Sequence, residues 1–143
     1  STQGVSSAAS DVYKRQVKLR EQLGLLSGPV EEFQKSAEAE HNAMLSMLVD
    51  EGYLDASALE DELANENEII DALYRGLKGS PCKLMAASIV DAVGEKRTQN
   101  QPGTSNEYPN WRIPLADGDG NVVPLGQLFD NTRLQEIAAI MRG

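Results

Sequence analysis

The sequence predicts a mostly α-helical chain with one short apolar segment, and three observations support this prediction. Over residues 17–79, apolar side chains recur at spacings of three and four, which is the pattern of amphipathic helices. The same spacing returns near the end of the chain, where Leu134, Ile137 and Met141 would share one helix face. Between these regions, residues 82–93 are nearly all apolar over the length of a strand. Periodicity alone does not separate a buried strand from a buried helix in this segment.

The composition is that of an ordinary globular protein and argues against several functional classes. The 143 residues are 41% hydrophobic and 24% charged, with a net charge of −9. We expect neither nucleic acid nor a membrane as a partner, because binding to phosphates or anionic lipids needs a clustered positive field. No apolar run approaches the roughly 20 residues that span a bilayer.

Cysteine and histidine usage also limits the chemistry. One cysteine, Cys82, and one histidine, His41, cannot fill the tetrahedral shell of a zinc ion. We therefore expect no metal and no other cofactor. A lone cysteine has no partner for a disulfide within the chain, which fits a cytoplasmic protein.

Residues 1–16 are predicted to be disordered and foreign to the protein. They are rich in serine and alanine, weakly apolar and without periodicity. The string of residues 5–16 resembles a sequencing adapter translated in frame. We therefore expect the protein's own sequence to begin near Val17.

Several helices are expected in the helical region that follows. The longest has Pro29 in its first turn, where the missing N–H of proline would have had no partner, and it ends at Gly52. Asp55 or Ser57 is expected to cap a shorter helix. A further helix, with Ile69 and its apolar neighbours on one face, closes the region.

The unusual feature is a polar loop that begins at residue 95 and ends in an Asp-Gly turn. It brings Tyr108 and Trp111 close together among asparagines, glutamines and prolines. Aromatic faces beside planar amides suit sugar rings, because C–H faces stack on the indole and hydroxyls pair with the amides. The same composition suits a packed Ω-loop with a tryptophan anchor, and composition alone favours this structural interpretation.

Two other candidate sites are weak. Asp117, Asp119 and Asn121 match the first ligand positions of a calcium-binding loop, but Val122 and Leu128 stand where that loop needs glycine and glutamate. A hairpin turn explains the Asp-Gly sequence better.

His41 falls within the apolar stripe of the longest helix, so we expect a packed histidine and not a catalytic one. No nucleophile motif lies near it. By this reasoning the chain contains no complete active site.

Three segments together resemble a known family. They are residues 17–26 (VKLREQLGLL), residues 80–94 (SPCKLMAASIVDAVG), and the run from Gln99 to Arg112, which contains Asn-Gln-Pro-Gly-Thr and Glu-Tyr-Pro-Asn-Trp-Arg. They resemble the C-terminal part of the 4-alpha-glucanotransferases (amylomaltases, glycoside hydrolase family 77). The resemblance extends from about Val17 to the end of the chain.

The resemblance implies an α/β fold, namely the C-terminal part of a (β/α)8 TIM barrel with a helical insertion. Such a barrel needs about 250 residues. Residues 17–79 would form the helical region and residues 80–94 the last barrel strand. Residues 95–121 would be a loop and turn on the active-site side, and residues 122–143 the terminal helix region.

The function that the resemblance implies is transfer of α-1,4-glucan segments to acceptor sugars with retention, so the partners would be malto-oligosaccharides and α-1,4-glucans. This chemistry uses a carboxylate nucleophile and a carboxylic acid/base. In the family these groups, and a third carboxylate, come from earlier strands, so we expect no catalytic residue in this chain and no activity from it alone. By family position, Asn100, Trp111 and Arg112 are the expected substrate-binding residues.

Two alternatives without catalysis stay open. One is a carbohydrate-binding module that uses Tyr108 and Trp111. The other is an acidic helical module whose charged faces bind a partner protein.

Overall fold

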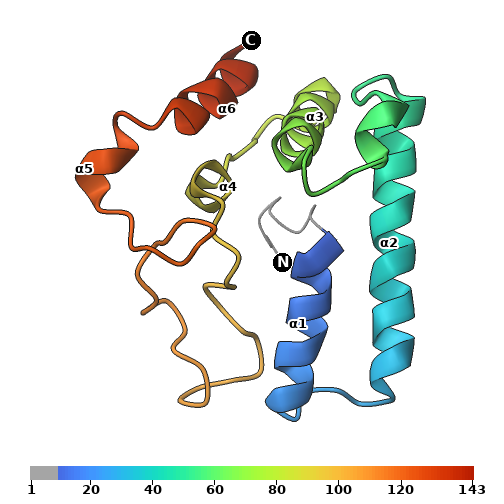
Figure 1. Ribbon diagram of the computed structural model, residues 1–143, viewed down its shortest axis with the longest axis vertical. Coiled ribbons are helices and arrows are strands. Elements are labelled where there is room, and N and C mark those ends of the chain that lie inside the picture. Colours follow the sequence, from blue (N-terminus) through green and yellow to red (C-terminus); the bar gives the residue numbers. More distant parts are fainter. Residues whose placement is uncertain (1–9) are drawn as a thin grey trace.

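The computed structural model describes residues 10–143, and within this range it is helical and contains no strand. The elements are α1 (Ser10–Gln22), α2 (Val30–Asp50), the 3-10 helix η2 (Ala56–Leu59), α3 (Glu66–Gly79), α4 (Ile89–Val93), α5 (Leu125–Leu128) and α6 (Thr132–Arg142) (Figure 1). In the described part of the chain, no helix has both the length and the apolar character needed to cross a membrane.

Helices α1 and α2 lie side by side and run in opposite directions, joined by a short connection (Figure 1). Gly24, at a φ of 66°, lies in this connection, and Pro29 is the residue directly before α2, one position ahead of the first turn in which it was expected. The Arg20 guanidinium lies 5.8 Å from the centre of the Phe33 ring, which adds a cation–π contact between the two helices.

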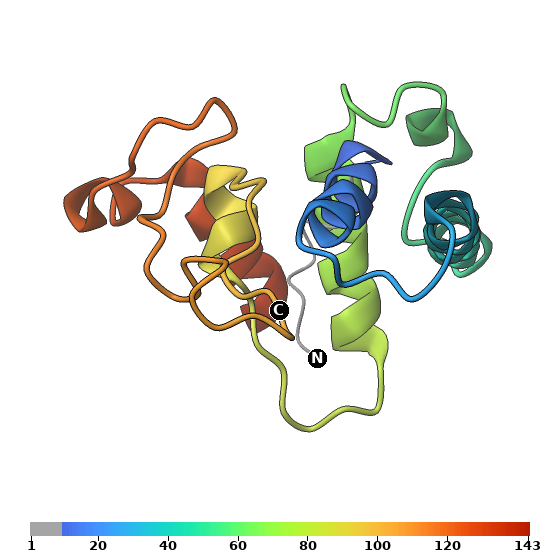
Figure 2. The same ribbon diagram turned by 90° about the horizontal axis from the view of Figure 1, so that it is seen from below.

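The core lies where α2, α3, α4 and α6 meet, and α3 packs between α2 on one side and α6 on the other (Figure 2). The apolar faces predicted from spacing supply it. Leu45 and Leu48 come from α2, Ile69 and Ile70 from α3, and Ile137 from α6, and all five are buried. Each buried aliphatic side chain contributes about 1.5–3 kcal/mol relative to exposure, so these faces stabilise the packing of the four helices.

The predicted last barrel strand at residues 80–94 is wrong for this structure. Residues 82–88 carry no helix or strand, and residues 89–93 form α4. Leu84 is 93% exposed, whereas Asp91, Ala92 and Val93 are buried. A strand needs a neighbour to satisfy its backbone N–H and C=O groups, and no strand in the described range offers one. A helix meets this need within itself, so the end of the apolar run becomes helical.

The predicted disorder of residues 1–16 is wrong for residues 10–16, which form the first part of α1. Residues 1–9 lie outside the described range. The origin of the adapter-like string stays a prediction, because a helix can form from a foreign sequence as well as from a native one.

A buried polar pair joins α3 to α4. The Tyr74 hydroxyl donates to Asp91 Oδ2 at 2.5 Å and accepts from the Ser88 backbone N–H at 2.9 Å. Both side chains are almost fully buried, at 0% exposure for Tyr74 and 1% for Asp91. Burial and the hydrogen bond to Asp91 raise the pKa of the Tyr74 phenol far above its ordinary value. This pair fixes the short α4, and therefore the point at which the polar loop begins.

Candidate functional site

The polar loop leaves α4 through Gly94. This glycine has a φ of 73°, a left-handed conformation that suits glycine, and it turns the chain away from the helix axis. The chain then passes outward and returns at residues 114–116, beside its starting point, before the Asp-Gly turn. We call residues 98–113 the excursion loop. It contains all three residues expected to bind substrate.

Both ends of the excursion loop are tied by the carboxylate of Glu95, which is 2% exposed. Oε1 accepts from the Arg97 backbone N–H and from Arg97 Nε, both at 2.9 Å. Oε2 accepts from Arg97 Nη2 at 2.6 Å and from the Ala116 backbone N–H at 3.0 Å. Arg97 Nη2 also donates to the Pro114 carbonyl oxygen at 2.8 Å. We call this arrangement the Glu95 clamp.

The charge state of the clamp follows from these contacts. Burial by itself would raise the pKa of Glu95, but hydrogen bonds from the Arg97 side chain and from the backbone N–H groups of Arg97 and Ala116 outweigh it, so the pKa is lowered. The hydrogen bond to Glu95 in turn raises the pKa of Arg97. The pair is therefore ionised at neutral pH.

Inside the excursion loop, Asn110 organises the backbone. Its side-chain oxygen accepts from the Gln101 N–H at 2.7 Å, and its amide nitrogen donates to the Thr104 hydroxyl at 2.9 Å. That hydroxyl donates to the Gln101 carbonyl oxygen at 2.7 Å. The Asn-Gln-Pro-Gly-Thr run and the Tyr-Pro-Asn-Trp-Arg run are thus bound to each other by side-chain hydrogen bonds.

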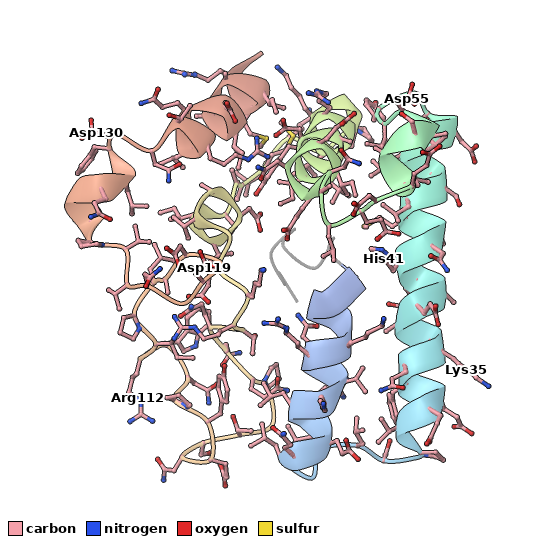
Figure 3. The ribbon with its side chains drawn as sticks, in the orientation of Figure 1. Lys35, His41, Asp55, Arg112, Asp119 and Asp130 are labelled. Carbon is pink, nitrogen blue, oxygen red and sulfur yellow. The ribbon has the colours of Figure 1, made fainter. Side chains whose placement is uncertain are left out.

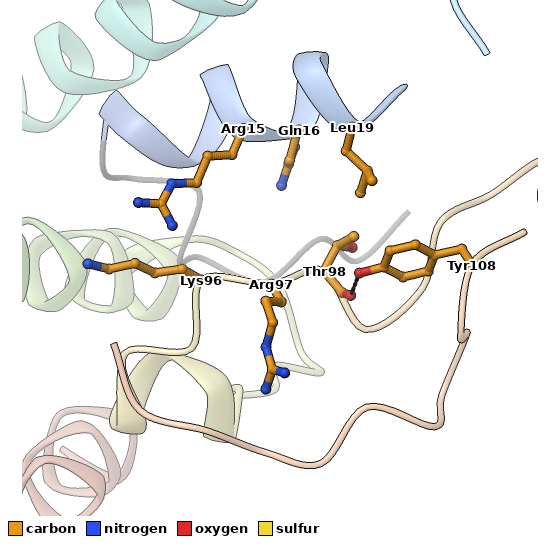
Figure 4. A pocket seen from close by; sticks show the side chains of 7 residues that line it. All are labelled: Arg15, Gln16, Leu19, Lys96, Arg97, Thr98 and Tyr108. Atoms are coloured by element: carbon orange, nitrogen blue, oxygen red, sulfur yellow. Dashed lines mark hydrogen bonds between the residues drawn. The ribbon is translucent and has the colours of Figure 1, made fainter. Parts of the chain in front are cut away.

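Tyr108 anchors the loop to its own base. Its hydroxyl donates to the Thr98 carbonyl oxygen at 2.6 Å, and burial raises the pKa of this phenol (Figure 4). The ring borders a cavity of about 220 Å³ between the loop base and α1, whose lining includes Arg15, Lys96 and Arg97. Because its hydroxyl is bonded to the backbone, Tyr108 serves as the aromatic anchor of the loop.

Trp111 does not anchor the loop, so the tryptophan-anchor interpretation is wrong for this structure. The residue is 75% exposed, and its φ of 58° is the only positive value outside glycine in the described range. The backbone N–H of Trp111 donates to the Gln99 carbonyl oxygen at 2.8 Å. A bulky residue in this conformation costs about 1–3 kcal/mol, so the surrounding hydrogen bonds hold the indole outward against a backbone preference.

The other two residues expected to bind substrate flank this position. Arg112 is exposed and extends outward from the loop (Figure 3). Asn100 is partly buried, and its backbone carbonyl oxygen accepts from the Thr98 hydroxyl at 2.9 Å. The hydrogen bond between Trp111 and Gln99 places the backbone of Trp111 beside that of Asn100. The three residues therefore share one loop.

The Asp-Gly segment is the hairpin turn that the sequence predicted. Asp117 Oδ1 accepts from the Asp119 N–H at 3.0 Å and from the Asn121 N–H at 2.9 Å, and Ala116 and Val122 form an antiparallel bridge. Asp117 therefore stabilises its own turn. Residues 10–143 contain no group of three or more acidic, histidine or cysteine side chains that could hold a metal ion.

His41 is packed, as predicted. It is 7% exposed on α2, and its Nε2 lies 2.7 Å from Glu62 Oε2. It is far in the fold from the excursion loop (Figure 3).

Sequence reasoning missed Glu95 and the Tyr74–Asp91 pair. A glutamate two residues before an arginine, directly after a glycine that ends a helix, is the only signal in the sequence for the clamp. Such a pair is common on exposed surfaces, so the spacing does not distinguish a buried clamp from solvated charges. The arrangement as a whole can bind polar ligands through amides, a guanidinium and an indole face, and its described side chains offer no activated nucleophile.

The comparisons with known proteins agree with one another. The sequence model of a family described as 4-alpha-glucanotransferase matches residues 21–118. The chain is 45% identical over 127 residues to a 4-alpha-glucanotransferase from Mycobacterium bovis, and it is 29% identical over 137 residues to one from Haemophilus influenzae. These matches cover 89% and 94% of this chain but only 17% and 19% of the relatives.

Among solved structures, the chain is similar to an amylomaltase from Corynebacterium glutamicum, with a TM-score of 0.78 and 29% sequence identity. The similarity covers 96% of this chain and 20% of that one. The chain thus spans about a fifth of the length of the relatives that it matches.

Proposed function

The chain belongs to the 4-alpha-glucanotransferase family, and we propose that it supplies a sugar-binding loop to an enzyme that transfers α-1,4-glucan segments to acceptor sugars. In that whole protein the chain would form the C-terminal part of a (β/α)8 barrel. The observation that carries the proposal is the excursion loop, which lies within the segment matched to the family and holds Trp111 exposed at a positive φ.

Each of the three expected residues would contribute a different contact. The Trp111 indole offers a flat apolar face on which a glucose ring can stack through its C–H groups. The side chain of Asn100 both donates and accepts hydrogen bonds, so it can pair with a sugar hydroxyl. Arg112, which is exposed, offers further donors for hydroxyls or the ring oxygen.

The bond-breaking groups would come from elsewhere in the whole protein. Retaining transfer needs a carboxylate nucleophile and a second carboxyl group that acts first as acid and then as base. The excursion loop provides no such pair. Its role would be to hold the glucan chain, and malto-oligosaccharides and α-1,4-glucans would be the ligands. A cytoplasmic location, with neither nucleic acid nor membrane as a partner, completes the proposal.

The sole tryptophan of the chain makes the proposal directly testable, because all indole fluorescence comes from Trp111. Stacking of a glucose ring should change its emission in a saturable way when maltoheptaose is added. Cellohexaose, in which glucose is joined by β-1,4 bonds, should have a much smaller effect at equal concentration. A chain with intact far-UV circular dichroism and no response to maltoheptaose would contradict the proposed sugar contact.

A further inference from the structure

We propose that Glu95 is a positioning residue for sugar binding: by joining the two ends of the excursion loop it sets where Trp111 and Asn100 meet a glucan. This inference rests on the proposed function for its sugar-binding consequence. Glu95 is not one of the three residues expected to bind substrate. Its carboxylate is buried and accepts hydrogen bonds from N–H groups of the same chain.

The Glu95 carboxylate has no spare capacity to accept hydrogen bonds. It accepts from the Arg97 N–H, Arg97 Nε, Arg97 Nη2 and the Ala116 N–H. An ionised carboxylate offers about four acceptor sites, so every site is used to hold the chain. A group that is fully used in this way has a structural task at the loop ends and is not available to a ligand.

The clamp joins the segment before the excursion loop to the segment after it. Arg97 lies before the excursion loop, and Ala116 and Pro114 lie at its return. Within the loop, Asn110 and Tyr108 connect residues to one another and to the loop base. Opening the clamp would therefore free the return segment at residues 114–116 and weaken the nearby hydrogen bond from the Trp111 backbone N–H to Gln99, while the helical core keeps its packing.

Glu95→Gln is the direct test. It keeps the size of the side chain but replaces one acceptor oxygen by an NH2 group, which faces donors of Arg97 or Ala116 and cannot accept from them. We expect hydrogen exchange of the Trp111 amide, which is bonded to Gln99, to become roughly 10-fold faster or more. We expect the affinity for maltoheptaose, measured by Trp111 fluorescence, to fall roughly 10- to 100-fold.

Asp71→Asn is the matched control. Asp71 of α3 forms an ion pair with Arg133 of α6 at 2.7 Å, and this pair is also largely buried but lies at the α3–α6 contact. If Glu95 had only a general structural role, both variants would accelerate hydrogen exchange at the Trp111 amide in proportion to their loss of stability. Positioning predicts that only Glu95→Gln accelerates exchange at Trp111. Equal effects from the two variants, or wild-type exchange in Glu95→Gln, would overturn the proposal.

Arg97→Lys covers the case in which Glu95→Gln does not fold. It keeps the charge but lacks the two-pronged geometry, so it should give a smaller acceleration of exchange in a folded chain. Unchanged exchange in this variant would overturn the proposal. If wild-type protein does not respond to maltoheptaose, the proposed function fails, and the exchange measurements still decide whether Glu95 closes the loop.

Discussion

Trp111 combines a large apolar surface exposed to water with a backbone conformation that bulky residues avoid. Either feature alone is ordinary on a protein surface. Together they indicate that the loop holds the indole outward in an unfavourable backbone conformation. Packing of Trp111 does not offset this cost, because its side chain is mostly exposed in the described chain. Such local strain is typical of binding sites, where the geometry needed by the ligand outweighs the preference of the backbone.

Substituting Trp111 separates binding from stability. In Trp111→Gly the left-handed backbone carries no penalty, and little packing is lost, so we expect no decrease in the melting temperature. Maltoheptaose binding, measured by titration calorimetry, should disappear. A clear loss of thermal stability would instead identify Trp111 as an anchor of the fold.

Asn100 tests the hydrogen-bonding part of the loop. Asn100→Ala in an active full-length enzyme carrying this segment should lower kcat/KM roughly 5- to 150-fold, equivalent to about 1–3 kcal/mol for one lost contact to a sugar hydroxyl. The melting temperature of the same variant tests the alternative, a purely structural role for Asn100. Unchanged kcat/KM with a lower melting temperature would show that Asn100 only braces the Pro102–Gly103 turn.

At the scale of elements, α4 is short and depends on side-chain hydrogen bonds for its place. Tyr74→Phe removes the donor to Asp91 and the acceptor for the Ser88 N–H, both in a nearly water-free position. We expect the free energy of unfolding to fall by about 1–3 kcal/mol, the usual cost of removing one partner from buried hydrogen bonds. Urea unfolding at neutral pH measures it, and a change within error would show that the pair does not stabilise α4.

The Glu95 clamp predicts a loss of stability in acid. Because the pKa of Glu95 is lowered in the folded chain, its stabilising effect is fully present above the ordinary value of 4.5 and is lost as the pH falls through the lowered pKa. Arg97, whose pKa is raised, stays charged throughout. The stability difference between wild type and Glu95→Gln, measured by urea unfolding, should therefore shrink below about pH 4.5. A difference that stays constant from pH 7 to pH 3 would contradict an ionised clamp.

At the scale of the whole molecule, the helices were predictable and the apolar segment after them was not. The spacing of Leu45, Leu48, Ile69 and Ile137 identifies buried faces because a helix has a fixed period. Residues 82–93 have no such period, so their state depends on neighbours. In the described chain no strand lies beside them, and Tyr74 forms a hydrogen bond with Asp91 of the short helix α4.

The candidate site was predictable in part for a similar reason. Rare residue types drew attention to residues 99–112, but composition could not show which aromatic is buried. Tyr108 anchors the loop through a backbone carbonyl, and Trp111 is left exposed. Glu95 could not be identified from the sequence. Its hydrogen bond with the Ala116 N–H joins residues that are distant in sequence, and no local pattern predicts its burial.

Glucan transfer by a chimera tests whether this chain can serve as part of a 4-alpha-glucanotransferase. Residues 17–143 would replace the matched segment of the Mycobacterium bovis 4-alpha-glucanotransferase, which is 45% identical over 127 residues. We predict that this chimera converts maltotriose into glucose and longer malto-oligosaccharides. We predict that the isolated 143-residue chain does not, because we propose that the catalytic carboxylates come from other parts of the whole protein. A folded chimera without transfer activity, or transfer by the purified chain alone, would show that the proposed function is wrong.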